Sequence, residues 1–415
     1  MRIGVISTRL NGTDGVSLEV EKWARVLEGM GHEMYYCAGE LGGYAENNST
    51  HIPKLHFAND SIRALSHRAF EGGSSADSDE LIGEIYNLAD ELRAPLRGFI
   101  RSNRLELIVV QNALTIPMNL PLGVCLTGLI AELGIKTIAH HHDFFWERER
   151  YQTNAIMGLL DTTFPCELPT LRHVTINSIA QKRLCERRNI DSTVIPNVLD
   201  FASPPKGMDN FNKDLRKRLG VDKDEYFIVQ PTRVIRRKGI EMALELVANL
   251  GMENPRLFVT HSATDEGLSY WHWLQHEAKM LKVDLRLIDD LIGAERVQSN
   301  GDKIYALWDV YPHADLVTYP STYEGFGNGL LEAIYFKRLT MVNEYPVFNA
   351  DIRPLGFEFI MIEGFLGDHT VQETRELLND PERVKQMTEK NYEIARQHFS
   401  YETLSGKLQE VLDSF

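Results

Sequence analysis

The hydrophobic positions of the chain recur in a repeating order: a short apolar run, a polar loop and an amphipathic segment. The first apolar run covers residues 2–7 and has the length and composition of a buried strand. After the next loop, Val20, Trp23, Ala24 and Leu27 recur at the i, i+3, i+4, i+7 spacing of a helix that packs on a sheet. This order predicts a strand, a loop and a helix.

The same order continues to the end of the chain. Further strands are predicted over residues 105–111, 136–142, 174–177, 226–230, 257–261, 285–288, 314–320 and 340–342. Helices are predicted over residues 80–100, 123–133, 178–188, 240–250, 304–310, 330–336, 371–378 and 381–397. Strands that alternate with helices favour parallel sheets covered on both faces, so the predicted fold class is α/β with doubly wound sheets.

The length bounds the number of domains. A chain of 415 residues is too long for one ordinary core, and two domains of roughly 200 residues are expected. Hydrophobic residues make up 43% and charged residues 25% of the chain, as in ordinary globular proteins. No run of 18 apolar residues occurs, and residues 1–7 lack the apolar core of a signal peptide. We therefore expect a cytoplasmic protein without integral membrane contact.

Net charge limits the classes of binding partner, and the spacing of the cysteines indicates their chemical state. Acidic residues outnumber basic ones by 59 to 44, which gives a formal charge of −15. Such a field disfavours nucleic acid and anionic lipid as partners. The four cysteines, Cys37, Cys125, Cys166 and Cys185, are far apart and lack metal-binding spacing. Reduced and mostly buried thiols are therefore expected.

The candidate chemistry centres on residues 321–344, where a predicted strand is followed by a glycine-rich loop and a helix. Gly325, Gly327 and Gly329 allow the backbone to approach a ligand closely. The first N–H groups of the following helix, with the positive end of its dipole, are typical of a phosphate or sugar-hydroxyl site.

Two carboxylates frame this loop. Glu324 and Glu332 have seven residues between them. A carboxylate accepts two hydrogen bonds at once, which suits the vicinal hydroxyls of a ribose or hexose. From the loop alone, a glycine turn with a glutamate at a helix start is an equally good interpretation.

A basic cluster occurs at the start of the predicted second domain. Arg233, Arg236, Arg237 and Lys238 fall within six residues at the carboxyl end of the strand predicted over residues 226–230, and a glycine and a helix follow. On charge alone a solvated surface is the commoner interpretation, and a phosphate site is the alternative.

Polar residues end two predicted strands of the first domain. Asn112 follows one strand, and His140, His141, His142 and Asp143 end the next. Open α/β sheets bind ligands at the carboxyl ends of their strands. Three adjacent imidazoles alternate sides in an extended segment, so they are poor ligands for one metal ion, whereas a single histidine beside an aspartate suits a sugar hydroxyl. Solvent-facing or core histidines are the alternative.

Several segments together resemble glycosyltransferase family 4, the retaining nucleotide-sugar transferases of GT-B fold. Pro320-Ser321, Glu324-Gly325-Phe326-Gly327 and Leu331-Glu332-Ala333 resemble the E-x7-E signature of that family. Residues 233–239 are similar to its R-x4-K-G element, and residues 194–200 to its IPNGVD element, with Val198 in place of the usual glycine. The resemblance covers nearly the whole chain except residues 41–103.

The resemblance implies a GT-B fold, with two Rossmann-like domains facing across a cleft, and a role for each matching residue. The implied catalytic residues are His142, Glu324, Arg233 and Lys238. The implied donor-binding residues are Gly15, Arg233, Lys238, Glu324, Gly325, Phe326, Gly327, Asn328 and Glu332. The implied acceptor-binding residues are Asn112, His141 and Asp143. Arg236 and Arg237 are expected at the surface.

Two of these assignments carry alternatives. Family members place a histidine near the reaction centre at the end of the matching strand; His142 fits this place best and His141 second, and the sequence does not decide among His140, His141 and His142. Family members also carry a glycine pair after the first strand, where this chain has Gly12 and Gly15. A plain turn is an equal interpretation of that loop.

The resemblance also implies domain boundaries and an activity. Residues 1–201 form the acceptor-side domain, residues 202–396 the nucleotide-sugar-binding domain, and residues 397–415 a last helix that crosses back onto the first domain. The implied enzyme is a retaining hexosyltransferase that uses a nucleoside-diphosphate sugar of the GDP-mannose or UDP-glucose type and a small soluble acceptor. No tightly bound metal is implied, since Arg233 and Lys238 supply the positive charge; stimulation by Mg²⁺ and a homo-oligomer stay open.

The identity of the acceptor is indicated only by short sequence similarities, and two alternative functions stay open. Residues 12–17 and 142–144 are similar to synthases of compatible solutes, which points to glucosylglycerate or another sugar or glycerate compound as acceptor. A sugar-nucleotide epimerase or a disaccharide phosphorylase of the same architecture is one alternative. A non-catalytic sugar-nucleotide-binding protein is the other.

Overall fold

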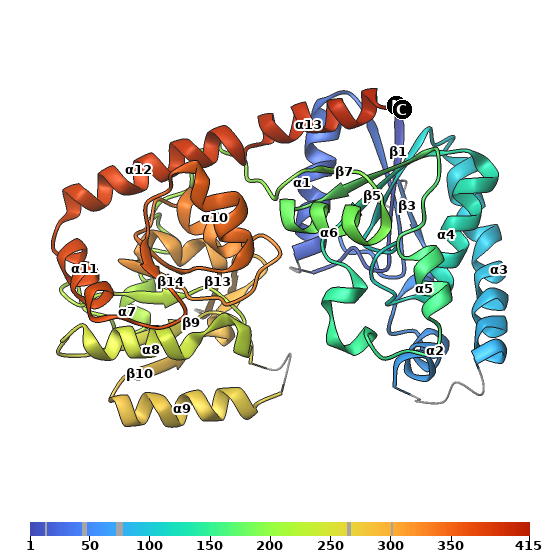
Figure 1. Cartoon of the computed structure of the whole chain (residues 1–415). Helices are drawn as coiled ribbons and strands as arrows, with labels where there is room; N and C mark the ends of the chain where they lie inside the picture. The colour runs from blue at the N-terminus through green and yellow to red at the C-terminus, as the bar shows by residue number, and fades with distance from the viewer. Residues whose placement is uncertain (13–14, 44–47, 72–77, 264–266, 300–301) are drawn as a thin grey trace. The chain divides into compact units, whose positions relative to one another are not determined.

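A computed structural model of the chain describes residues 1–12, 15–43, 48–71, 78–263, 267–299 and 302–415. The contacts divide the chain into two compact units, residues 1–198 with 401–415 (unit 1) and residues 199–400 (unit 2). Each unit has its own parallel sheet (Figure 1). Each also has its own clusters of buried apolar side chains. The predicted boundaries after residues 201 and 396 fall within four residues of this division.

Unit 1 is built on a seven-stranded parallel sheet. Its strands are, in spatial order, β3 (Ser49–His51), β2 (Glu33–Ala38), β1 (Arg2–Ser7), β4 (Leu107–Gln111), β5 (Lys136–His141), β6 (Leu171–Thr175) and β7 (Ser192–Val194). Its helices are α1 (Gly15–Gly29), α2 (Asp60–Phe70), α3 (Ser78–Ser102), α4 (Leu120–Leu133), α5 (Met157–Thr163), α6 (Ser178–Arg188) and α13 (Tyr401–Asp413).

Both faces of this sheet are covered, because successive side chains of a strand point to opposite sides. Val5 of β1 packs in one core cluster with residues of α1 and α13. Ile6, the next residue, packs in another cluster with residues of α3 and α4. The strands are therefore apolar on both faces, which explains why their sequences read as nearly continuous apolar runs.

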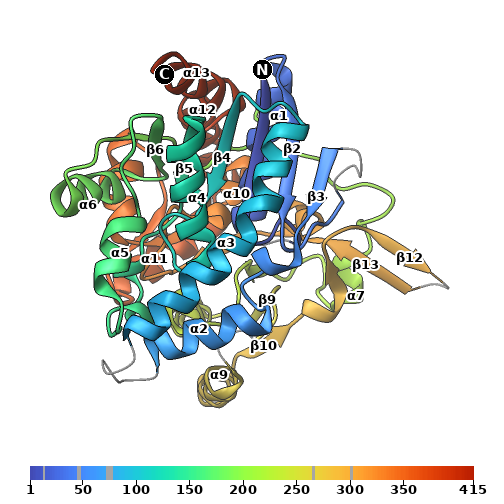
Figure 2. The same ribbon diagram turned by 90° about the vertical axis from the view of Figure 1, so that its right-hand side faces the viewer.

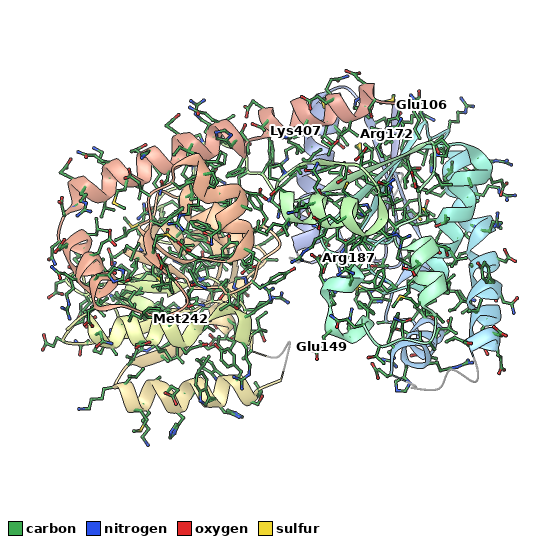
Figure 3. The ribbon with its side chains drawn as sticks, viewed as in Figure 1. Glu106, Glu149, Arg172, Arg187, Met242 and Lys407 are labelled. Carbon is green, nitrogen blue, oxygen red and sulfur yellow. The ribbon has the colours of Figure 1, made fainter. Side chains whose placement is uncertain are left out.

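The C-terminal helix α13 completes the core of unit 1. Leu404, Leu408 and Val411 are buried in the cluster that contains the α1 face of the sheet. Arg172 of β6, labelled in Figure 3, donates a hydrogen bond of 2.7 Å to the carbonyl oxygen of Ser414 and lies 4.8 Å from the ring centroid of Phe415.

Unit 2 repeats the doubly wound pattern with six parallel strands. Their spatial order is β10 (Asp284–Leu287), β9 (Arg256–Val259), β8 (Ile228–Gln230), β14 (Leu316–Tyr319), β15 (Thr340–Asn343) and β16 (Ile360–Ile362). The helices are α7 (Leu215–Arg218), α8 (Ile240–Asn249), α9 (Ser269–Leu281), α10 (Asn328–Tyr335), α11 (Asp368–Leu378) and α12 (Pro381–His398). The predicted fold class, two doubly wound Rossmann-like α/β domains of GT-B type, is confirmed.

A small third sheet corrects one prediction. The helix predicted over residues 304–310 is wrong: β13 (Asp302–Ala306) pairs in parallel with β11 (Ile292–Gly293) and antiparallel with β12 (Val297–Ser299). Figure 2 shows β12 and β13 side by side near the right-hand edge of the view. The spacing of Ile304, Leu307 and Trp308 imitates a helix. The strand ends at Ala306, however, and a single 3₁₀ turn over Leu307–Asp309 follows it. Local periodicity does not reveal the pairing of β13 with β11 and β12.

The cysteines are free thiols, and three of the four are buried. Burial raises the pKa of Cys37 and of Cys125 to about 12, and Cys166 is buried as well. Cys185 on α6 is exposed. None of the helices in the described ranges has the length and apolar content needed to span a lipid bilayer.

Gly239 is the residue at which the loops after β8 and β14 touch, and it should not tolerate a side chain. Its φ is +60°, and a Cβ there would overlap the carbonyl oxygen of Pro320. We expect Gly239→Ala to lower the free energy of unfolding by about 2–4 kcal/mol, the sum of left-handed backbone strain and overpacking. Urea unfolding measures this.

Gly220→Ala is the matched control, because Gly220 has a similar φ of +68° but its nearest neighbouring atom would be 3.9 Å away. This control should lose only the backbone term, about 1 kcal/mol. Equal losses in the two variants would contradict the close approach to Pro320.

Candidate functional site

The strand order of unit 2 changes direction between β8 and β14, with β9 and β10 on one side and β15 and β16 on the other. Doubly wound sheets bind ligands at this point, beyond the carboxyl ends of the strands. The loop after β8 carries the basic cluster, and the loop after β14 carries the glycine-rich segment. The two segments predicted to form a site therefore leave the sheet from neighbouring strands.

Hydrogen bonds tie the two loops together. The backbone N–H of Thr322 donates to the carbonyl of Arg237 at 2.8 Å. The buried side chain of Gln230 donates to the carbonyl of Lys238 at 2.9 Å, and its amide oxygen accepts from Thr318 at 3.2 Å. These bonds set the position of Lys238 relative to β14.

Glu324 is the centre of the site in unit 2. Its side chain is buried, and one carboxylate oxygen forms an ion pair with the buried Lys238 ammonium. The other oxygen accepts a hydrogen bond of 2.9 Å from Arg237, which also donates to the carbonyl of Tyr323 at 2.8 Å. Lys238 and Glu324, to which the resemblance gives roles in catalysis and donor binding, are therefore in direct contact, while those roles stay predictions.

Three charges share this small volume. Burial raises the pKa of the Glu324 carboxyl, but the charges of Lys238 and Arg237 outweigh burial, so the pKa lies below its usual value. The pKa of Lys238 is lowered by burial, against which Glu324 acts, and further by the charges of Arg237 and Arg233. Glu324 is thus ionised at neutral pH and holds two cations in place.

One of the two residues of the basic cluster that contact Glu324 differs from the pair that the sequence predicts to form the site. Arg237, expected at the surface, is a partner of Glu324, because a short 3₁₀ turn over Arg236–Lys238 changes the direction of the chain. Nothing in the local sequence distinguishes that turn from an extended segment. Arg233 is exposed, and its charge acts on Lys238. Arg236 is exposed, and its guanidinium lies 5.2 Å from the ring centroid of Tyr270.

The glycine-rich loop is packed against tyrosines. Gly327 has a φ of +120°, and a Cβ there would lie 2.6 Å from the hydroxyl of Tyr345, which donates to the carbonyl of Phe326 at 2.8 Å. Only glycine fits this backbone and this space. Asn328 then begins α10, so the predicted donor-binding residues 325–328 lead directly into a helix N-terminus.

Glu332 lies inside α10 and is partly buried. Its Oε2 accepts a hydrogen bond of 2.7 Å from the hydroxyl of the buried Tyr311. Burial and the charge of Glu332 raise the pKa of that hydroxyl, so Tyr311 remains a donor. The carboxylate is therefore held in one orientation by the protein.

The strand order of unit 1 changes direction between β1 and β4. The loop after β1 contains Gly12, with a φ of +82°, and Gly15 is the first residue of α1. Thr13 and Asp14 of the predicted glycine loop lie outside the described residues. Asn112 follows β4, and His142 and Asp143 follow the adjacent β5, so the predicted acceptor residues share the carboxyl edge of this sheet.

Asn112 joins the ends of β4 and β5. It has a φ of +57°, a conformation that asparagine tolerates better than most residues. Its Oδ1 accepts from the backbone N–H of His142 at 3.0 Å and from the hydroxyl of Thr115 at 3.2 Å. Its Nδ2 donates to Asp143 at 3.0 Å, and Asp143 also pairs with Arg148.

The three adjacent histidines have three different environments. His140 is 1% exposed and its ring stacks on Trp23, with centroids 4.1 Å apart. His141 is also 1% exposed, and its Nε2 lies 2.8 Å from Nδ1 of His173. His142 is only partly buried, and its Nε2 lies 3.2 Å from the amide oxygen of Gln111. The placement gives no support to His141 as an acceptor contact, whereas His142 is accessible.

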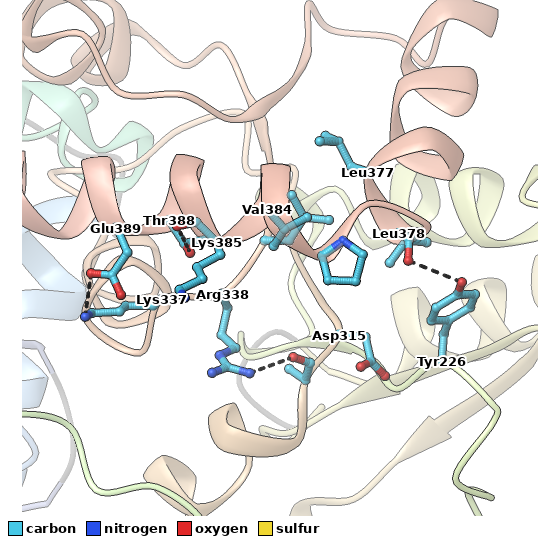
Figure 4. Close-up of a pocket in the computed structure, with 13 residues that line it drawn as sticks. Tyr226, Asp315, Lys337, Arg338, Leu377, Leu378, Val384, Lys385, Thr388 and Glu389 are labelled. Carbon is cyan, nitrogen blue, oxygen red and sulfur yellow. Dashed lines mark hydrogen bonds and ion pairs between the residues drawn. The ribbon is translucent and has the colours of Figure 1, made fainter.

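A cavity of about 400 Å³ lies at the other end of the unit 2 sheet (Figure 4). It is lined by residues within two positions before β8, β14 and β15, namely Tyr226, Asp315 and Leu339, and by the start of α12. It is therefore separate from the Glu324 site, which is at the carboxyl ends of the same strands. Within the residues that the structure describes, no group of three or more histidine, cysteine, aspartate or glutamate side chains is placed to hold a metal ion.

Comparison with known proteins agrees with this geometry. Residues 211–394, which include Lys238 and Glu324, match the sequence profile of the family described as Glycosyl transferases group 1. A mannosylglucosylglycerate synthase of Thermotoga maritima is 32% identical over 99% of this chain and 100% of its own length. The chain belongs to the group 1 glycosyl transferases. A synthase with the same description from Petrotoga mobilis is 31% identical over 87% of this chain and 86% of its own length.

The fold of this glycosyltransferase has a solved counterpart. A glycosyltransferase of Rickettsia africae covers 99% of this chain and 97% of its own, with a TM-score of 0.69 and 13% identity. At that identity the likeness concerns the fold alone. The family membership makes the chain a glycosyltransferase, as the E-x7-E resemblance implied, while the roles of individual residues stay predictions.

In this glycosyltransferase the ion pair of Glu324 should be essential for the stability of unit 2. Lys238→Met leaves the buried carboxylate with Arg237 alone and should cost roughly 3–5 kcal/mol of unfolding free energy. The double variant Lys238→Met/Glu324→Gln removes the buried charge and should recover part of the loss. Urea unfolding of both variants measures the difference. Lys390→Met, which breaks an exposed pair with Glu358, is the control and should cost no more than about 1 kcal/mol.

The buried histidines should make unit 1 of the enzyme sensitive to acid. Burial is the main cause that lowers the pKa values of His140, His141 and His173, the last to about 4. These rings are neutral in the folded state, whereas an unfolded imidazole takes up a proton near pH 6.5. Below that pH the unfolded state binds more protons, so the unfolding free energy should fall toward pH 4, by up to about 1.4 kcal/mol per pH unit for each histidine.

Urea unfolding at a series of pH values measures this slope. His140→Phe, which keeps a ring against Trp23, should have a shallower slope between pH 6.5 and 4. His276→Gln, an exposed position on α9, should leave the slope unchanged. A slope in His140→Phe equal to that of the wild type would show that His140 takes up its proton equally in both states.

Proposed function

We propose that this glycosyltransferase transfers a mannosyl group from GDP-mannose to glucosylglycerate, with retention of configuration at the sugar C1. The names of the two relatives, which describe synthases of mannosylglucosylglycerate, support the sugar and the acceptor. The observation that carries the donor side is the convergence of Lys238 and Arg237 on buried Glu324 at the carboxyl ends of β8 and β14.

On the donor side, Arg233 and Lys238 neutralise the diphosphate, and the backbone from Gly325 to Asn328 approaches it at the start of α10. This supports the proposal because the nucleotide-sugar carries two negative charges, and positive charge placed where the diphosphate departs stabilises the transition state. Glu332 binds ribose hydroxyls with a carboxylate that Tyr311 already orients. Glu324 binds hydroxyls of the donor sugar and keeps Lys238 in place. Mg²⁺ is then a possible stimulant and not a required ligand.

The chemical step has one bond broken and one formed. The bond from the sugar C1 to the phosphate oxygen breaks, and the acceptor hydroxyl oxygen bonds to C1 on the same face. The hydroxyl proton passes to the departing phosphate oxygen. Glu324 is a poor candidate for a covalent nucleophile, because both of its oxygens are occupied by cations. This supports reaction on one face through a state with positive charge at C1.

On the acceptor side, Asn112 and Asp143 offer amide and carboxylate groups to acceptor hydroxyls, and His142 stabilises the positive charge that develops near C1. The mutual hydrogen bonds of Asn112, His142 and Asp143 support a set that acts together. Arg148, the partner of Asp143, adds a positive charge at the same edge, which suits a glycerate carboxylate.

The proposal is tested by incubating the pure enzyme with GDP-mannose or UDP-glucose, with and without glucosylglycerate. We expect release of nucleoside diphosphate only with GDP-mannose and acceptor together, and an NMR spectrum of the product that shows the same anomeric configuration as the donor. Turnover with UDP-glucose, or release without acceptor at the same rate, would contradict the proposed donor or acceptor.

Arg233→Ala and Arg236→Ala form a matched pair in that assay, because both arginines are exposed on one loop. Arg233→Ala should lower turnover by more than about tenfold, equivalent to roughly 1.4 kcal/mol of transition-state stabilisation. Arg236→Ala should stay within about threefold of the wild type. Equal effects would remove Arg233 from the diphosphate site.

A further inference from the structure

Gln111, the last residue of β4, is in an unusual position for an amide. It is 2% exposed, and its Oε1 lies 3.2 Å from Nε2 of His142. An amide oxygen only accepts hydrogen bonds, so this contact requires His142 to carry a proton on Nε2. The contact therefore selects one tautomer of the neutral imidazole.

The other end of the same amide shows why a glutamine is needed. Its Nε2 is buried and has no hydrogen-bond partner in the described ranges. A buried donor without a partner lowers stability, and a methionine of similar shape would avoid that cost. His142 is the side-chain partner that this amide has, so the contact with His142 is what the amide contributes here.

A second group supports the ring of His142. The centroid of the His140 ring lies 4.4 Å from that of His142, and His140 itself stacks on Trp23 of α1. Burial lowers the pKa of His140 well below its usual value, so this ring remains uncharged. An uncharged ring, which is itself fixed by stacking on Trp23, therefore packs against His142.

The backbone of His142 is also fixed, by the hydrogen bond of its N–H to Asn112. The backbone N–H, the ring and the ring Nε2 of His142 thus each contact a different residue. The titratable groups beside it in the described ranges include His140, His141 and the Asp143–Arg148 pair, and Gln111 is the side chain placed at hydrogen-bond distance from its Nε2.

We propose that Gln111 is a positioning residue, which fixes the orientation and the tautomer of His142 for its role near the sugar C1. The proposal rests on the role of His142 in the proposed function. It also selects His142 from the three adjacent histidines as the catalytic one. His140 is buried against Trp23 and His141 pairs with His173, whereas His142 is accessible and contacts an amide.

The test compares Gln111→Met with Gln111→Glu. Gln111→Met keeps the shape and removes the acceptor, so kcat should fall by about tenfold or more while KM for donor and acceptor stays within about threefold. Gln111→Glu keeps an acceptor and adds a negative charge, which stabilises the imidazolium. It should raise the pKa of His142 by about one unit or more, and the limb of the pH–rate profile that depends on His142 should move with it.

The second readout does not depend on turnover. Nitrogen NMR of enzyme labelled on histidine, with the His142 signal assigned by its loss in His142→Asn, reports the tautomer and the pKa of this ring. In the wild type the neutral ring should carry its proton on Nε2, and this preference should disappear in Gln111→Met. Thr175→Val is the control at the carboxyl end of β6: it is buried, its hydroxyl lacks a partner in the described part of the chain, and it should change neither signal.

The outcomes separate this proposal from the proposed function. An unchanged tautomer in Gln111→Met together with an unchanged His142 pKa in Gln111→Glu would overturn the role of Gln111, even if the enzyme transfers mannose. If the NMR signals change as expected but no transfer occurs with GDP-mannose and glucosylglycerate, the role of Gln111 stands and the proposed substrates are wrong. Far-UV circular dichroism and melting temperature show whether each variant is folded.

Discussion

A buried carboxylate holds two loops of unit 2 together. Glu324 lies at the carboxyl end of the sheet with two cations on its oxygens, and both cations come from the loop after the neighbouring strand. A buried carboxylate without partners would be too costly to keep ionised, so the two loops must stay together. The absence of a side chain at Gly239 permits that approach, and the Thr322–Arg237 hydrogen bond fixes it.

Further hydrogen bonds fix the orientation of the groups near Glu324 and of Glu332. Gln230, which is hydrogen-bonded to Thr318, donates to the carbonyl of Lys238. Tyr345 donates to the glycine-rich loop, and Tyr311 donates to Glu332. Groups that are already oriented lose little freedom when a ligand binds, which is the condition for stabilising a transition state through fixed charges. Family membership in the group 1 glycosyl transferases and this geometry therefore support each other.

The sequence predicts much of the fold because strand and helix periods are local properties. The helix over residues 178–188 has the bounds of α6, and the strand over residues 340–342 differs from β15 by one residue. The strand β13 was not predicted, because its formation depends on partner strands and not on its own pattern. The segments of the Glu324 site were found through their motifs, but the roles given to its residues stay predictions.

The contact of Arg237 with Glu324 and the burial of the three histidines could not be predicted from the sequence. Arg237 differs from Arg236 only by the direction that a three-residue turn gives it. The order of burial among His140, His141 and His142 depends on Trp23 and His173, which are far away in the chain. A linear pattern states that side chains alternate across a strand, but which side faces an aromatic ring is decided by packing between distant elements.

The placement of α13 has a consequence for synthesis. The chain enters unit 1, leaves it after residue 198, and returns only at residue 401, and Leu404, Leu408 and Val411 fill the core on the α1 side of the sheet. While a ribosome is still translating unit 2, the nascent unit 1 has an open apolar face. Unit 2 is continuous in the chain and can complete its core without residues 401–415. Unit 1, most of which leaves the ribosome first, is therefore the unit that completes its core last.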